Sequence, residues 1–210
     1  MNLDLINLMS HATIAVQLVS MLTAFSTWLK LRTSALRWMA LYVTIEFCRS
    51  SIGRITAHYS INNHKFFLYS GLLTQVAFFL FSLSILKDQK RRRFTQWAYG
   101  VTLTAFLLIA VFQLPLSVRM IFMFPYIFEI VVGVSILNDR IYHHEGKRFN
   151  EDPWSIIAMV IVLTVSISFI CIISAPLIKL PGPIINVFIC TNIISVFVRN
   201  CLITNQLWKL

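Results

Sequence analysis

The chain has 210 residues, of which 58% are hydrophobic and only 12% are charged, and its mean hydropathy is +0.76. Soluble domains carry about 25% charged residues, so this composition excludes an ordinary soluble enzyme and favours a protein embedded in a membrane. The formal net charge of +10 fits either a nucleic-acid-binding protein or a membrane protein with basic loops. The positions of the Lys and Arg residues along the chain distinguish these two classes.

Seven apolar stretches follow one another along the chain, and each approaches the length of about 20 residues that a helix needs to cross a bilayer. Their approximate ranges are 8–29, 37–57, 66–86, 94–114, 118–137, 154–175 and 184–203. The sequence therefore predicts an all-α protein with one transmembrane domain over residues 1–210, a bundle of seven transmembrane helices. The first residues contain Asp4 but no Lys or Arg, so we expect no cleaved signal peptide and a first helix that is retained.

The orientation follows from the Lys and Arg residues, which are enriched in cytoplasmic loops. Alternate breaks on one side hold most of them: Lys30, Arg32, Arg37, Lys87, Lys90, Arg91, Arg92, Arg93, Arg140, Lys147, Arg148 and Lys209. All five tryptophans, which favour the membrane interface, fall at the same side: Trp28, Trp38, Trp97, Trp154 and Trp208. We therefore expect a multi-pass protein of the cytoplasmic (inner) membrane, with its N-terminus outside and its C-terminus in the cytoplasm.

The most basic segment follows directly after the third apolar stretch and contains Lys87, Lys90, Arg91, Arg92 and Arg93. A cluster of this kind next to a span is attracted to anionic lipid, by about 1 kcal/mol for each charge. We interpret it as a membrane-surface anchor. The lipid bilayer is thus a partner of the chain, and no nucleic-acid partner is expected.

Ionisable side chains inside a membrane cost about 2.5–3.5 kcal/mol each on insertion scales, which makes every one a candidate functional residue. Four qualify: Glu46, Arg49, Glu129 and Arg199. Glu46 and Arg49 are three residues apart and share a helix face. We expect these four, extended by Gln75 and Asn192, to form a ligand or proton site near the middle of the bundle. The alternative is that they only satisfy one another as interhelical contacts; Thr74, Gln17 and Asn186 are further polar candidates.

Other residues indicate little chemistry. The four cysteines fall inside predicted helices and are interpreted as packing residues, and Pro125 predicts a kink in the fifth helix. His143, His144 and Glu145 are adjacent, a spacing that does not place two histidines on one helix face as a zinc-binding HExxH motif does. We therefore expect no metal, no cofactor and no catalytic residue.

Similar lengths of helices one to three and four to six suggest an inverted repeat, which is a feature of transporters. Glu46 and Glu129 would then lie in equivalent second helices. Against this, Arg49 has Val132 at the matching position, and the first half contains no counterpart of Pro125. Both alternatives remain open at this point.

Two segments carry a resemblance. One is Gly53-Arg-Ile-Thr-Ala-His-Tyr-Ser-Ile-Asn-Asn63 followed by Phe66-Phe-Leu-Tyr69, and the other is Glu151-Asp-Pro-Trp154. The chain loosely resembles a group of small bacterial proteins with seven transmembrane helices and no characterised function. The resemblance implies the seven-helix topology and a bacterial source. Where that group has a glutamate in the middle of helix three, this sequence has Gln75.

Three functions are compatible with these features. The first is a small membrane sensor or partner-regulating subunit, which acts through another membrane or cytoplasmic protein or through a homo-oligomer. The second is a transporter of a small solute, ion or proton that uses mid-membrane carboxylates. The third and least favoured is an intramembrane enzyme, since the carboxylates are isolated from the histidines.

Overall fold

The structure is a computed structural model that describes residues 3–59, 64–111, 118–143, 151–177 and 182–210. These residues form seven α-helices and no strand, which confirms the all-α prediction. The helices are α1 (Leu3–Leu31), α2 (Ser34–His58), α3 (His64–Ile85), α4 (Gln89–Val111), α5 (Val118–Tyr142), α6 (Pro153–Leu177) and α7 (Gly182–Trp208).

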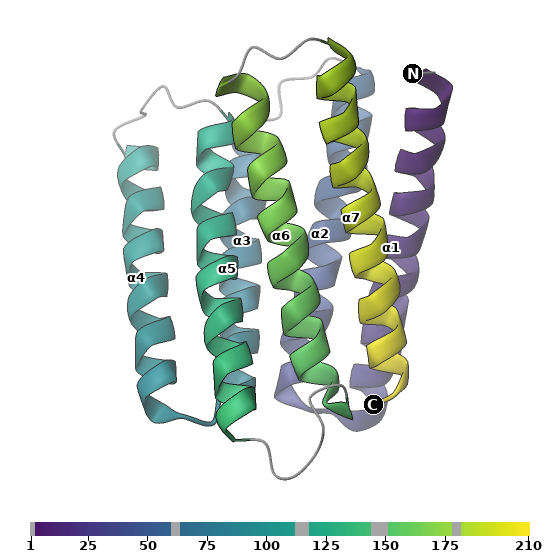
Figure 1. Cartoon of the computed structure of the whole chain (residues 1–210). Helices are drawn as coiled ribbons and strands as arrows, with labels where there is room; N and C mark the ends of the chain where they lie inside the picture. Colours follow the sequence, from purple (N-terminus) through teal and green to yellow (C-terminus); the bar gives the residue numbers. More distant parts are fainter. Residues whose placement is uncertain (1–2, 60–63, 112–117, 144–150, 178–181) are drawn as a thin grey trace.

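Six of the helices form a closed ring, and the seventh stands outside it (Figure 1). Around the ring, α1 packs on α2, α2 on α3, α3 on α5, α5 on α6, α6 on α7, and α7 returns to α1. Helix α4 packs mainly on α3 and α5, outside the ring. The two ends of the chain lie at opposite ends of the bundle. We call the end that holds the C-terminus the basic end.

Local capping explains where the helices at the basic end begin. Thr33 accepts hydrogen bonds from the backbone of Leu36 and Arg37 and so caps α2. Asp88 caps α4 by accepting the N–H of Lys90 at 2.9 Å. Asp152 caps α6, where it accepts the hydroxyl of Ser155 at 2.6 Å, and Pro153 occupies the first helical position, which suits its fixed backbone angle.

A buried carboxylate ties the turn between α3 and α4 to the end of α5. Both oxygens of Asp139 accept backbone N–H groups, from Lys87 at 2.9 Å and from Asp88 at 3.0 Å. The next residue, Arg140, donates to the carbonyl of Ile85 at 2.9 Å and pairs with Asp152 at 3.7 Å. These contacts extend from α3 to α6, so they hold four helices together at the basic end.

The apolar core fills the half of the ring nearer the basic end. Its largest fully buried side chains come from α2, α3, α5, α6 and α7: Leu36, Met39, Tyr42, Phe78, Phe81, Phe128, Ile136, Ile157, Ile161, Ile203 and Leu207. Toward the opposite end a smaller cluster around Phe106 and Ile109 packs between α3, α4 and α5, whereas α2 and α7 are packed less tightly. The described side chains of α2 beyond Glu46, and those of α7 before Arg199, are all half-buried or exposed.

Four helices contain stretches long and apolar enough to cross a membrane: Ile6–Leu31, Lys65–Ile85, Pro153–Cys171 and Ile184–Trp208. Within the described residues, α2, α4 and α5 contain no such stretch. Their outer surfaces are nevertheless apolar: Leu41, Ile52 and Ile55 on α2, Val101, Leu107 and Leu108 on α4, and Ile127, Val131 and Val134 on α5 are all exposed. A protein with buried charges and an apolar exterior is suited to a lipid environment.

The helix boundaries differ from the sequence prediction mainly at the basic end. Helix α4 begins at Gln89, not near residue 94, and α5 continues to Tyr142, not 137. Asp88 caps the charged first turn of α4, and the contacts of Asp139 and Arg140 with the turn before α4 hold the polar end of α5 in place. The structure also argues against the inverted repeat, because α1 belongs to the ring and α4, its supposed counterpart, lies outside.

The close packing of α5 on α6 generates a first prediction. A Cβ atom at Gly133 would collide with the Val162 side chain, whereas one at Gly100 on α4 would meet nothing within 4 Å. We expect Gly133→Ala to lower the free energy of unfolding by about 1–3 kcal/mol through overpacking. Gly100→Ala should be neutral or raise it by up to about 1 kcal/mol, because alanine favours a helix.

Thermal unfolding of the protein in detergent measures both changes. The double variant Gly133→Ala with Val162→Ala should recover part of the lost stability, since the shorter side chain removes the collision. Equal stability of the Gly133 and Gly100 variants would contradict the close contact between α5 and α6.

The buried Asp139 provides a second prediction. Asp139→Ala leaves the N–H groups of Lys87 and Asp88 without their acceptor and should cost about 2–4 kcal/mol of unfolding free energy. Its exposed neighbour Asn138 is the control, and Asn138→Ala should change stability by less than about 0.5 kcal/mol. Similar melting temperatures for the two variants would show that Asp139 does not stabilise the turn.

Candidate functional site

Three ionised side chains meet inside the ring, halfway along the bundle. The Glu46 carboxylate on α2 pairs with Arg49 of the same helix at 2.5 Å and with Arg199 of α7 at 3.0 Å. The contact with Arg199 crosses the ring, because α2 and α7 are both neighbours of α1 but not of each other. Glu46 therefore joins two helices that do not pack on each other extensively.

A second carboxylate lies close to this group but is held differently. Glu129 on α5 accepts a hydrogen bond from the Tyr42 hydroxyl at 3.2 Å, and both residues are buried. Tyr126, one turn before Glu129, lies within electrostatic range of Arg49 and Glu46. We call Glu46, Arg49, Arg199, Glu129 and Tyr42 the central cluster. It contains two carboxylates and two guanidinium groups and is therefore balanced in charge.

Helical spacing explains why these side chains converge. Tyr42, Glu46 and Arg49 follow at intervals of four and three, so they line one face of α2. Arg199 lies nearer the basic end than Glu46, but helical side chains lean toward their own N-terminus. On α7 that direction points away from the basic end, and the long arginine side chain thereby reaches Glu46.

Two glutamine amides are buried near the same depth. Neither the nitrogen nor the oxygen of Gln17 on α1 or of Gln75 on α3 has a hydrogen-bond partner among the described residues. Gln75 is four residues from Gly71, whose Cβ position faces Pro125, so it lies on the side of α3 that faces α5. Buried amides are normally hydrogen-bonded, and these two are suited to contact a polar molecule or water.

Asn192 is separate from the central cluster. It accepts a hydrogen bond from the Ser168 hydroxyl at 2.6 Å and so joins α7 to α6. Of the six residues predicted for one site, the structure brings together Glu46, Arg49 and Arg199 in direct contact, with Glu129 close by. Both arginines bind Glu46, whereas the sequence left open which carboxylate each would serve.

The central cluster lies at the boundary between the packed and the loose half of the bundle. On the side of Glu46 toward the basic end, the Phe78 ring contacts both Tyr42 and Phe128. Above it the described parts of α2 and α7 carry no fully buried side chain. The side chain of Arg49 retains 12% of its surface exposed, against 7% for Glu46 and 6% for Arg199. Arg49 is thus the most accessible of the three charges.

Three grooves on the described part of the bundle are lined by residues outside the central cluster. One runs between α4 and α5, and two others run between α1 and α7. Within the described ranges no group of three or more His, Cys, Asp or Glu residues is placed to hold a metal ion. His143 is the first of the adjacent residues His143, His144 and Glu145, and its Nδ1 lies 3.3 Å from Oδ1 of Asp139. Residues 144 and 145 are outside the described ranges.

The structure corrects the interpretation of two cysteines. All four are free thiols, but Cys48 and Cys201 are exposed on the outer surface and do not pack inside the bundle. Tyr42 was missed as a site residue. Its position four residues before Glu46 was the available signal, because that spacing places its hydroxyl on the same helix face.

No protein-family model matches the chain, and no similar curated protein or solved structure was found. The functional conclusion therefore rests on the buried charges and on the packing around them. Chemically, the central cluster is suited to bind a small anion or polar solute through Arg49 and Arg199, or to take up a proton on a carboxylate.

The unequal environments of the two carboxylates generate a third prediction. Glu46→Gln removes the charge that two buried arginines share and should lower the free energy of unfolding by about 3–5 kcal/mol. Glu129→Gln replaces an acceptor of one neutral hydroxyl and should cost about 1 kcal/mol. Thermal unfolding in detergent compares these matched substitutions. A larger loss for Glu129→Gln would contradict the assignment of both arginines to Glu46.

Proposed function

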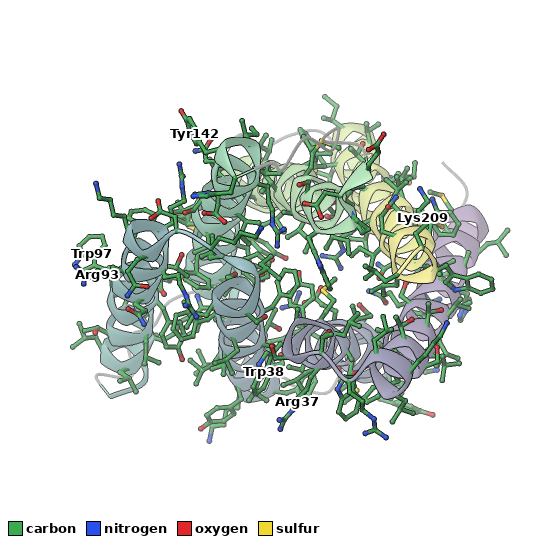
Figure 2. The ribbon with its side chains drawn as sticks, turned by 90° about the horizontal axis from the view of Figure 1, so that it is seen from below. Arg37, Trp38, Arg93, Trp97, Tyr142 and Lys209 are labelled. Atoms are coloured by element: carbon green, nitrogen blue, oxygen red, sulfur yellow. The ribbon has the colours of Figure 1, made fainter. Side chains whose placement is uncertain are left out.

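We propose that all seven helices cross the cytoplasmic membrane of a bacterial cell, with the basic end in the cytoplasm. The apolar outer surfaces of α2, α4 and α5, together with the four apolar helices, support seven spans. Figure 2 looks onto the basic end and displays Arg37, Trp38, Arg93, Trp97, Tyr142 and Lys209 around its rim. Basic residues and interfacial aromatic residues favour the cytoplasmic surface.

Within this membrane the protein acts as a small sensor or partner-regulating subunit. One observation carries the proposal: the Glu46 carboxylate, which binds Arg199 across the ring, lies at the base of the loosely packed half. A solute that approaches from the outer side meets Arg49 first, because that side chain is the most accessible. Arg49 and Arg199 present guanidinium donors at this point, and such donors suit a small anionic ligand such as a carboxylate or phosphate compound.

Ligand binding would change the structure through competition for the arginines. An anion that binds Arg49 and Arg199 weakens their contacts with Glu46, and the cross-ring link between α2 and α7 is then released. Such a link is a two-state element, because a buried ion pair is either formed or replaced by another partner. Movement of α7 relative to α2 would reach the basic end, where another membrane or cytoplasmic protein, or a second copy of this chain, receives the signal.

The packing below the central cluster favours a sensor over a transporter. A transported solute has to pass through the bundle, but Tyr42, Phe78 and Phe128 occupy the space directly below Glu46. One observation supports transport as the alternative: Glu129 is held by a single neutral hydroxyl and is therefore a candidate for proton exchange. An enzymatic function has no comparable support among the described residues.

The sensor proposal is tested by measuring the partner stoichiometry of the wild type and two variants after mild-detergent purification from native membranes. Mass spectrometry of the purified complex should find a defined partner or a homo-oligomer. Glu46→Gln should change the bound fraction at least about fivefold, because a change of about 1 kcal/mol in the two-state equilibrium has this effect. The exposed Glu151 at the basic end is the matched control, and Glu151→Gln should leave the bound fraction unchanged.

A monomeric protein without a stoichiometric partner would contradict the sensor proposal. Flux of a small anion or proton into vesicles that contain the protein, abolished in Glu129→Gln with retained fold, would instead establish the transporter. A similar loss of partner in the Glu46 and Glu151 variants would mean that the surface, and not the central cluster, controls association.

A further inference from the structure

The groove between α4 and α5 lies apart from the central cluster and has a volume of about 610 Å³. Helix α4 stands outside the ring and packs mainly on α3 and α5, so this groove opens onto the outer surface of the bundle (Figure 1). We propose that it is a binding site for one anionic phospholipid, whose phosphate lies at the basic end and whose acyl chain lies along α5. The inference goes beyond the sensor function and rests only on the proposed membrane insertion.

The walls of the groove are suited to an acyl chain. On α5, Ile130, Val131 and Val134 form one apolar stripe, and Phe94 faces them from α4. The groove continues to Asn138, eight residues beyond Ile130, which corresponds to about 12 Å along the helix. Val131, Val134 and Phe94 are exposed, so a bound chain would cover apolar surface that no described residue covers.

The charges at the mouth of the groove are suited to a phosphate. Lys90 and Arg91 line the groove on the first turn of α4, and the Lys90 ammonium forms no ion pair within the described ranges. Asp88 also lines the groove, but its carboxylate already accepts the N–H of Lys90 and lies 3.6 Å from Arg91. The residues at the mouth therefore keep one surplus positive charge.

Polar groups and an aromatic ring complete the mouth. Ser135 and Asn138 on α5 line it opposite the basic residues and offer hydrogen-bond donors to a headgroup. Arg91 also lies over the Tyr142 ring at 5.4 Å, which holds its guanidinium at the end of the groove. By contrast, the Arg92 side chain donates a hydrogen bond to the carbonyl of Leu83 on α3 at 3.1 Å and so binds α3. Within this basic segment, Arg92 thus contacts α3, while Lys90 and Arg91 belong to the proposed lipid site.

Native mass spectrometry of the full chain, released from bilayers of phosphatidylcholine with a minority of phosphatidylglycerol, tests the site. The wild type should retain one phosphatidylglycerol molecule in preference to phosphatidylcholine. Lys90→Gln with Arg91→Gln should lower that preference about 25-fold, because each cation near anionic lipid contributes a factor of about five. Arg37→Gln with Lys209→Gln removes the same charge at the same end, away from α4 (Figure 2), and should retain the lipid.

A second variant separates shape from charge. Val134→Phe fills the groove without changing a charge, and we expect it to abolish retention of the single lipid while the fold survives. An excess of glycerol phosphate should not displace the lipid, because the free headgroup lacks the acyl chain. Equal losses in the two charge variants, retention in Val134→Phe, or displacement by glycerol phosphate would each overturn the proposal. None of these residues belongs to the central cluster, so failure here leaves the sensor proposal untouched.

Discussion

The ion pair between Glu46 and Arg199 determines how the bundle can be built. A charge inside a ring of helices is costly unless it is paired and hydrogen-bonded, and Glu46 meets this requirement only because α7 returns to the side of α1. This one contact is compatible with the order of the helices around the ring and with the position of α4 outside it. It is also compatible with the depth at which the aromatic core lies. Removing α4 from the ring leaves six helices, with α2 and α7 close enough for an arginine to reach across.

The polar and apolar side chains of this bundle are distributed differently from those of a soluble helical protein. The interior contains the ionised and amide side chains, while the exterior presents leucine, isoleucine and valine on every helix. Because buried charges lower the mean hydropathy of a helix, α2 and α5 appear more polar than their outer surfaces are. The charges of α5 illustrate it, since Glu129 and Asp139 are both buried, one beside Tyr42 and the other against the turn that opens α4.

Much of the helical architecture could be predicted from the sequence, because apolar runs of about 20 residues leave little choice of secondary structure. The pairing of Glu46 with Arg49 was also predictable, since both lie on one turn of one helix. The contact with Arg199 was not, because it depends on which helices are neighbours, and short loops do not reveal that α4 leaves the ring. Asp139 was missed for a related reason: its partners are backbone groups, and backbone groups carry no sequence signal.

The separation of Glu46 and Arg199 by 153 residues has a consequence for biosynthesis. Membrane proteins are made from the N-terminus, and α2 is synthesised well before α7. In the proposed seven-span arrangement, Glu46 has Arg49 on its own helix as its counter-charge during that interval, and the two side chains enter the bilayer as a neutral pair. Arg199, by contrast, is synthesised after Glu46, so its partner carboxylate is already present when α7 is inserted. Arg49 thus neutralises the Glu46 carboxylate until α7 is inserted. Helix α7 then packs into the bundle by forming the ion pair between Arg199 and Glu46.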